Sequence, residues 1–206
     1  MADLLLYHAA PSRSGTVRWM LEEIGEPYDI HLLDLNKGEN REPAYLAVNP
    51  MGKVPALRHA GVVITEAAAI CCYLADRFPA AGLNVSIEEP QRGPYLKWLF
   101  FGPSCYEPAI IDQTLNRERP PRRAVGWGDI DSVIGVLRQA VAGAPFLMGD
   151  RFTAADVVIG SCVRFGLMTK CLPALPEFAA YAKRLEDRPA LQRATAKDGE
   201  LFAKQR

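Results

Sequence analysis

Residues 49–57 read NPMGKVPAL, and residues 64–70 read ITEAAAI. Proline fixes its own φ angle and has no N–H, so the Val54-Pro55 pair at the start of a strand predicts a rigid turn. An X-Pro bond in such a turn can be cis, which leaves the backbone of the preceding residue pointing outward, free to pair with an extended peptide. The sequence therefore predicts a docking edge for a small peptide at Val54.

The second stretch predicts the start of a helix. Apolar side chains recur there at helical spacing, at Ala67, Ile70, Cys71, Leu74 and Phe78. Glu66 is expected in the first turn, where unpaired backbone N–H groups hold its carboxylate. A carboxylate in that position can receive an ammonium group.

The residues before the proline turn predict a strand, a helix and a second strand. Residues 4–7 are a continuous apolar run, which is typical of a strand buried on both faces. Residues 17–24 carry apolar side chains at helical spacing and are followed by Gly25, a common helix terminator. Residues 28–32 alternate between apolar and polar. With a hairpin at residues 56–64, the expected order is βαβ, an irregular segment, then ββα.

The N-P-x-G-K-V-P-A-L run followed by an Ile-Thr-Glu helix start resembles the glutathione-binding half of the cytosolic glutathione transferases. The resemblance runs through the whole chain, and it implies an α/β thioredoxin-like N-terminal domain and an all-α C-terminal domain. In that family the residue before a cis-proline pairs with the cysteinyl backbone of glutathione, and a Glu-Ser pair holds the γ-glutamyl end.

These roles fall on Val54, Pro55 and Glu66, and Lys53 is a candidate partner for a carboxylate of the peptide. The alternative for Lys53 is a solvated lysine on a turn. One departure from the family is visible, because Ala67 follows Glu66 where the family has serine. The side-chain hydroxyl of the Glu-Ser pair is therefore missing, and only the backbone N–H of Ala67 could still serve.

The resemblance places the group that activates the glutathione thiol after the first strand. A cysteine thiol has a pKa of about 8.5, whereas the nucleophile is the thiolate. A hydrogen-bond donor aimed at the sulfur, near the positive end of a helix dipole, stabilises that anion. Lowering the pKa by about two units requires roughly 2.7 kcal/mol, which one charge-assisted hydrogen bond and a helix terminus can supply.

Three residues could donate this hydrogen bond. Ser12 lies five residues after Tyr7, as does the catalytic serine of theta- and phi-like transferases when the strand is aligned. Alignment on the helix makes Ser14 a competitor, and Tyr7 occupies the place of the tyrosine that other classes use. Either serine could instead be a helix N-cap, and Tyr7 a core aromatic. Arg13 stands among the serines, so the cysteine of omega- and beta-like members is absent.

A shift in composition at residues 80–90 predicts a linker between a thioredoxin-like domain at 1–79 and a helical domain at 91–206. In the second domain, Thr153 and Asp156 have the spacing of a capping box, so Asp156 is expected to support folding. A further helix is expected between two prolines. Pro176 is expected to open it and Pro189 to stop it.

The resemblance implies that the second domain contributes the wall at which the electrophile binds. The candidates for this apolar pocket are Trp98, Phe101, Tyr106 and Phe165. Each of them could instead be an ordinary core residue, because aromatic side chains at helical spacing are usually buried.

Composition narrows the class of protein. The 206 residues, 49% of them hydrophobic, can bury the core of one large or two small domains. Lys and Arg number 24, as do Asp and Glu, so charge gives no argument for nucleic acid or an anionic membrane. The sequence lacks an apolar run of about 18 residues that could span a bilayer.

Five cysteines without framework spacing, and no leader segment, predict a reducing, cytoplasmic compartment. The three histidines lack the spacing of a metal site.

Taken together, these observations predict a bacterial, serine-containing glutathione transferase that acts in detoxification and, by family resemblance, forms a homodimer. Glutathione is the expected co-substrate, without a metal, and a small apolar electrophile is the second substrate. Two alternatives stay open. One is a glutathione-dependent disulfide or peroxide reductase, and the other is a non-catalytic binding module of the same fold.

Overall fold

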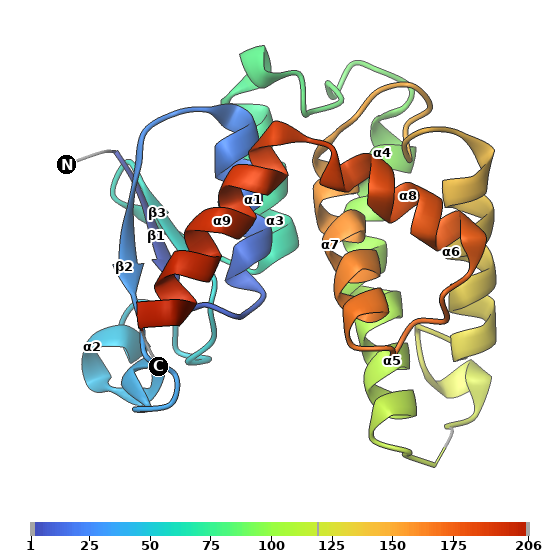
Figure 1. Ribbon diagram of the computed structural model, residues 1–206, viewed down its shortest axis with the longest axis horizontal. Helices are drawn as coiled ribbons and strands as arrows, with labels where there is room; N and C mark the ends of the chain where they lie inside the picture. The colour runs from blue at the N-terminus through green and yellow to red at the C-terminus, as the bar shows by residue number, and fades with distance from the viewer. Residues whose placement is uncertain (1–2, 119, 205–206) are drawn as a thin grey trace. The chain divides into compact units, whose positions relative to one another are not determined.

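A computed structural model describes residues 3–118 and 120–204 (Figure 1). The chain divides into two compact units. One contains the residues up to Ala81 together with those from Arg188 onward, and the other is Gly82–Asp187. The sequence placed the last helix in the C-terminal helical domain, whereas the structure groups it with the N-terminal unit.

A four-stranded mixed sheet in the order β2-β1-β3-β4 forms the centre of the first unit. Its strands are β1 (Leu4–His8), β2 (Tyr28–Leu32), β3 (Ala56–His59) and β4 (Val62–Thr65). Strand β1 runs parallel to β2, with Leu6 opposite Ile30, and antiparallel to β3, with Leu6 opposite Leu57. Strands β3 and β4 form the expected antiparallel hairpin. The predicted thioredoxin-like order is therefore confirmed.

Three long helices complete this unit, with short helical turns between them. They are α1 (Ser14–Ile24), α3 (Ala67–Arg77) and α9 (Pro189–Lys204), and the short ones are α2 (Pro43–Leu46), η1 (Glu39–Arg41) and η2 (Pro79–Ala81). Helix α1 contacts both α3 and α9, and Figure 1 shows α9 in red beside α1 in blue. Gly25 ends α1 as predicted, in a left-handed conformation at φ 81° that a residue with a Cβ rarely adopts.

The second unit is helical. Its elements are α4 (Arg92–Phe101), the π-helical turn η3 (Gly102–Tyr106), α5 (Glu107–Thr114), the 3₁₀ turn η4 (Arg122–Ala124), α6 (Ile130–Gly143), α7 (Ala154–Met168) and α8 (Pro176–Glu186). Helical spacing predicted this class of domain. It did not predict the π-helical turn between α4 and α5, where the backbone departs from the 3.6-residue period.

The capping box at the start of α7 is confirmed. The buried Asp156 carboxylate accepts hydrogen bonds from the N–H of Thr153 at 3.0 Å and of Leu147 at 2.9 Å, and from the hydroxyl of Tyr181 at 2.9 Å. Burial raises the pKa of Asp156 despite these hydrogen bonds, which act in the opposite direction. Asp156 thus joins three separate segments of this unit.

Pro189 has a second role, which the sequence did not predict. Helix α8 already ends at Glu186, and Pro189 is the first residue of α9. Proline is accepted at the first position of a helix because the N–H that it lacks would have no partner inside the helix there. Because proline lacks the N–H that a continuing helix needs, a proline that follows one helix can stop that helix, and it can also start the next.

Candidate active site

The turn between β1 and α1 holds two serines in different environments. Ser14 is the first residue of α1 and is fully buried. Its Oγ accepts the N–H of Ala9 at 3.1 Å, lies 2.8 Å from Nδ1 of His8, and lies 3.1 Å from the carbonyl oxygen of Ala9. Ser14 is therefore enclosed by protein atoms.

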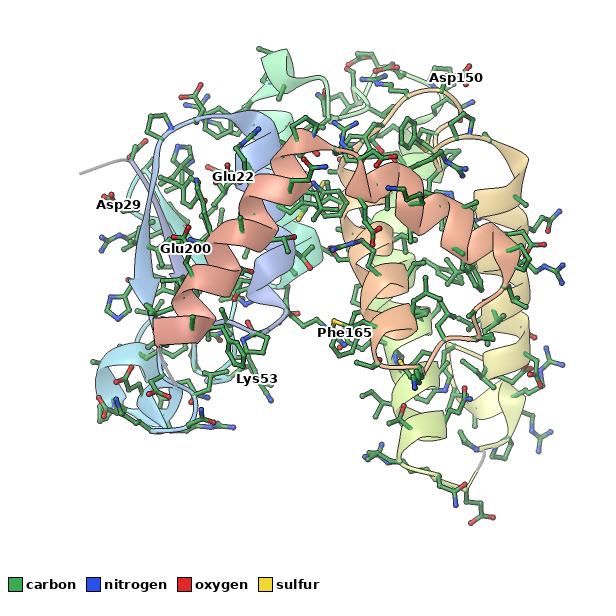
Figure 2. The ribbon with its side chains drawn as sticks, in the orientation of Figure 1. Glu22, Asp29, Lys53, Asp150, Phe165 and Glu200 are labelled. Atoms are coloured by element: carbon green, nitrogen blue, oxygen red, sulfur yellow. The ribbon has the colours of Figure 1, made fainter. Side chains whose placement is uncertain are left out.

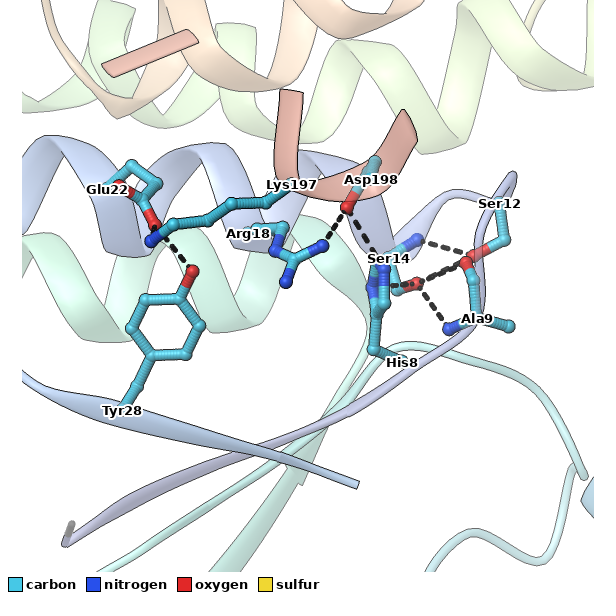
Figure 3. Close-up of polar contacts among 9 residues, drawn as sticks. All are labelled: His8, Ala9, Ser12, Ser14, Arg18, Glu22, Tyr28, Lys197 and Asp198. Atoms are coloured by element: carbon cyan, nitrogen blue, oxygen red, sulfur yellow. Dashed lines mark hydrogen bonds and ion pairs between the residues drawn. The ribbon is translucent and has the colours of Figure 1, made fainter. Parts of the chain in front are cut away.

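Ser12 is the partly exposed member of the pair. Its Oγ accepts the backbone N–H of Ser14 at 3.1 Å and lies 2.6 Å from Oγ of Ser14 (Figure 3). These contacts fix the Ser12 oxygen at the N-terminus of α1, where the helix dipole favours an anion. Because Ser12 retains exposed surface, it can meet a ligand from solvent.

Tyr7, the third candidate, belongs to the core of this unit. Its side chain is buried in a cluster with Leu33, Tyr45 and Ala56, and its ring centroid lies 5.7 Å from that of Tyr45. This placement agrees with the alternative interpretation of Tyr7 as a core aromatic.

The Val54-Pro55 peptide bond is cis, as the sequence allowed. The preceding loop is held by two side chains, because the carbonyl oxygen of Lys53 accepts the Tyr45 hydroxyl at 2.6 Å and the Asn49 amide at 2.7 Å. Burial raises the pKa of Tyr45 to about 12, so its hydroxyl remains a donor. Within the described part of the chain, the backbone N–H and C=O of Val54 make no hydrogen bond and remain available to a ligand.

Glu66 and Lys53 present charged groups to solvent beside this edge of the sheet. Glu66 is exposed, lies directly before the first residue of α3, and has an unusual φ of 69°. The sequence placed its carboxylate against the N–H groups of the helix, but among the described residues it makes no such capping hydrogen bond. Lys53 is likewise exposed (Figure 2). Neither side chain has an ion-pair partner among the described residues, so both can pair with charges on a ligand.

The four aromatic candidates of the second unit differ in accessibility. Trp98 and Tyr106 are buried in that unit, and the Tyr106 hydroxyl donates to the carbonyl oxygen of Cys162 at 3.1 Å. Phe101 is half-buried, and Phe165 is 37% exposed. An accessible apolar surface is therefore available from Phe101 and Phe165, whereas Trp98 and Tyr106 fit the core alternative.

Sequence reasoning missed three residues next to the serine turn. His8, one of the three histidines without metal-site spacing, is fully buried, and its Nε2 lies 3.1 Å from Oδ1 of Asp198 on α9. Arg18 on α1 also binds Asp198. Burial alone would raise the pKa of Asp198, but the contacts with His8 and Arg18 hold it below its ordinary value. The distance of Asp198 from the turn in the sequence leaves no pattern that could have found it.

Among residues 3–118 and 120–204, no group of three or more His, Cys, Asp or Glu side chains is placed to hold a metal ion. No helix in that same part of the chain has the length and apolar character needed to cross a membrane.

Known proteins resemble the chain over most of its length. The family model described as "Glutathione S-transferase, N-terminal domain" matches residues 12–77, and "Glutathione S-transferase, C-terminal domain" matches residues 128–198. Glutathione S-transferase GstA of Escherichia coli O157:H7 is 30% identical over 187 residues, which cover 87% of this chain and 90% of that protein. The probable glutathione S-transferase GSTF2 of Oryza sativa subsp. japonica is 30% identical over 214 residues, with 94% and 96% covered.

Solved structures show the same relationship. A glutathione transferase from Methylococcus capsulatus str. Bath has a TM-score of 0.79 at 28% identity, and the match covers 95% of this chain and 98% of that one. The glutathione transferase URE2P6 from Phanerochaete chrysosporium, in complex with oxidized glutathione, has a TM-score of 0.77 at 27% identity and covers 97% and 98%.

The fold defines a two-part class, in which a thioredoxin-like unit with a cis-proline edge accompanies a helical unit. Sequence similarity over nearly the whole length makes the assignment specific. The chain belongs to the glutathione S-transferase family.

Proposed function

We propose that this glutathione transferase is of the bacterial, serine-containing type with a theta/phi-like loop, and that Ser12 activates the thiol of glutathione. The observation that carries the proposal is the partly exposed Ser12 hydroxyl at the start of α1. Its Oγ accepts the Ser14 N–H at 3.1 Å, so the hydroxyl proton can be directed at a ligand. A thiolate accepting this proton at a helix N-terminus is stabilised over the neutral thiol.

Glutathione itself would bind along the edge of the sheet. The free backbone groups of Val54 match the cysteinyl backbone, with the cis bond to Pro55 beside it. The exposed carboxylate of Glu66 would pair with the γ-glutamyl ammonium group. The N–H of Ala67 would donate to one oxygen of the γ-glutamyl carboxylate, and Lys53 would pair with the carboxylate of the glycine end. The relative URE2P6, whose structure contains oxidized glutathione, supports glutathione as the ligand.

The second substrate would be a small apolar electrophile, for which Phe101 and Phe165 offer accessible aromatic surface. A cytoplasmic homodimer with a role in detoxification, working without a metal, completes the proposal and is typical of the family. The named relatives are glutathione transferases, which does not favour a disulfide or peroxide reductase or a non-catalytic module.

The experiment is a titration of glutathione across pH, following the ultraviolet absorbance of the bound thiolate. In the wild type a bound thiolate should form near neutral pH. In Ser12→Ala the apparent pKa of the bound thiol should rise by about one unit or more, since the donor to the sulfur is lost. Ser104→Ala, at an exposed serine of the helical unit, is the matched control. Binding without any change of thiol pKa in Ser12→Ala would contradict the role of Ser12.

A further inference from the structure

A chain of polar side chains runs inward from the proposed thiol-activating residue (Figure 3). Oγ of Ser12 lies 2.6 Å from Oγ of Ser14, which lies 2.8 Å from Nδ1 of His8. Nε2 of the same ring lies 3.1 Å from Oδ1 of Asp198, within ion-pair distance, although it makes no hydrogen bond among the described residues. The chain thus connects the turn after β1, the end of β1 and the last helix.

The two middle residues of this chain, His8 and Ser14, are closed to solvent, whereas the Asp198 side chain at its inner end is 26% exposed. His8 and Ser14 have no exposed surface, so the imidazole meets Ser14 on one side and Asp198 on the other. The charged groups that face it are Asp198 from α9 and, behind that carboxylate, Arg18 from α1. A Cβ on Gly15 would come within 3.0 Å of Oδ2 of Asp198, so the glycine permits this close approach of α9 to α1. A proton can reach the ring along the two serines.

We propose that His8 takes up the proton of the glutathione thiol through Ser14 and Ser12, and that Asp198 is the positioning residue that keeps the imidazole ready to do so. The proposal rests on the proposed function of Ser12. It goes beyond that function because it identifies where the proton goes when the thiolate forms.

Before ionisation, each hydroxyl points inward. The thiol S–H donates to Oγ of Ser12, the Ser12 hydroxyl donates to Oγ of Ser14, and the Ser14 hydroxyl donates to Nδ1 of a neutral His8. The remaining ring proton is on Nε2 and faces Asp198. Asp198 favours this tautomer because its carboxylate attracts an N–H rather than a lone pair.

Ionisation reverses the direction of every hydroxyl. The S–H bond breaks and its proton passes to Ser12, the proton of Ser12 passes to Ser14, and that of Ser14 passes to Nδ1 of His8. The products are a thiolate that accepts the Ser12 hydroxyl and an imidazolium that faces Asp198. No proton enters or leaves the chain, so the charge created on sulfur is balanced by a charge held inside the protein.

The backbone donors fit both states. Oγ of Ser14 always accepts the N–H of Ala9, and Oγ of Ser12 always accepts the N–H of Ser14. In either state each serine oxygen therefore donates one hydrogen bond and accepts two, which uses its full capacity. The carbonyl oxygen of Ala9, 3.1 Å from Oγ of Ser14, competes for the Ser14 proton, so the contact of His8 with Asp198 has to favour the orientation in which that proton points to Nδ1 of His8.

Two variants test the chain through the pKa of the bound thiol. Asp198→Asn removes the charge that stabilises the imidazolium, and His8→Asn replaces the ring with an amide that cannot take up a proton. Each should raise the thiol pKa by about one unit, while the affinity for S-methylglutathione, which has no ionisable thiol, changes less than about twofold. Glu200→Gln removes an exposed carboxylate from the same helix and should leave the pKa unchanged (Figure 2).

A measurement on the wild type does not depend on how the variants fold. Nitrogen-15 NMR of the histidine ring distinguishes the neutral tautomers from the imidazolium, and the His8 ring signal is assigned in the wild type by its correlation to the His8 backbone. Glutathione should convert His8 from the neutral Nε2–H form to the imidazolium at a pH where the thiolate forms, and S-methylglutathione should not. A His8 ring that stays neutral beside a bound thiolate overturns the proposal.

The outcomes separate this inference from the proposed function. If Ser12→Ala leaves the thiol pKa unchanged, the function of Ser12 fails and the relay fails with it. If Ser12→Ala raises the pKa but folded Asp198→Asn and His8→Asn match the wild type, only the relay is overturned. A rise in all three variants together with the imidazolium signal supports both.

Discussion

Arg188, the residue before α9, donates two hydrogen bonds to the carboxylate of Glu23 on α1, from Nε at 2.7 Å and from Nη2 at 2.8 Å. The Glu23 side chain is only 7% exposed, and it also accepts the indole N–H of Trp19 at 2.8 Å. Bidentate contacts of this kind are stronger than exposed ion pairs because both charges are partly desolvated. The contact holds the C-terminal segment on the N-terminal unit.

Arg188→Ala should therefore lower the free energy of unfolding by about 2 kcal/mol, because it leaves a nearly buried carboxylate without its partner. Chemical denaturation followed by circular dichroism measures this change. Arg58→Ala, at an exposed arginine of the same unit, should stay within about 0.5 kcal/mol of the wild type. Equal effects of the two substitutions would show that the bidentate contact adds no stability.

From the contacts of Glu22 we expect the free energy of unfolding to depend on pH. Burial alone would raise the pKa of its carboxyl, but hydrogen bonds from Lys197, Tyr28 and Arg193 hold it below its ordinary value. A group whose pKa is lowered by folding contributes stability above its unfolded pKa, and the contribution disappears as the pH falls through the folded pKa. The free energy of unfolding should thus decrease on acidification below about pH 4.5, close to the ordinary pKa of a glutamate. In Glu22→Gln this decrease should be smaller, and an unchanged slope in denaturation at several pH values would refute the prediction.

Asp156 should be among the most sensitive positions for stability. Asp156→Ala removes the N-cap partner of α7 and leaves the partly buried Leu147 N–H and the buried Tyr181 hydroxyl without this acceptor. The expected loss is about 3 kcal/mol or more in the free energy of unfolding. Thermal denaturation compares this variant with Asp150→Ala, an exposed aspartate six residues earlier, which should be nearly neutral.

Glu66 should matter for binding and not for stability. Its carboxylate is exposed and makes no capping hydrogen bond within the described residues, so Glu66→Gln should leave the melting temperature unchanged. Loss of a charged partner for the γ-glutamyl ammonium group should weaken glutathione binding about tenfold, or 1.4 kcal/mol. Calorimetric titration measures the affinity, with Glu42→Gln as the exposed control. Equal affinities would remove Glu66 from the binding site.

Ala67 offers a gain-of-function test. Ala67→Ser restores the hydroxyl that the family places after the glutamate, at the first residue of α3. One added hydrogen bond to the γ-glutamyl carboxylate should tighten glutathione binding about threefold to tenfold. Ala69→Ser, at an exposed position of the same helix, should have no effect. Weaker binding in Ala67→Ser would mean that the carboxylate of glutathione lies elsewhere.

The sequence predicted the features of this protein that depend on neighbouring residues. Apolar spacing predicted the four strands and the helices α1 and α3 in their order, Gly25 predicted the end of α1, and the Thr153 and Asp156 pair predicted the start of α7. Such signals are local, because a hydrogen bond across three or four residues, or a backbone conformation open only to glycine, leaves a mark at fixed spacing. Pro189 shows the limit, since its effect depends on the chain on both sides.

Only the tertiary structure showed which of the candidate serines is accessible and what lies behind it. Ser12 and Ser14 are nearly equivalent in sequence, but packing buries one and leaves the other partly open. Asp198 meets His8 because α9 folds back on α1, through ion pairs such as that of Arg188 with Glu23. Contacts between residues so far apart in the chain have no period and no fixed spacing. They exist because two helix surfaces are complementary, and this is determined only when the chain is packed.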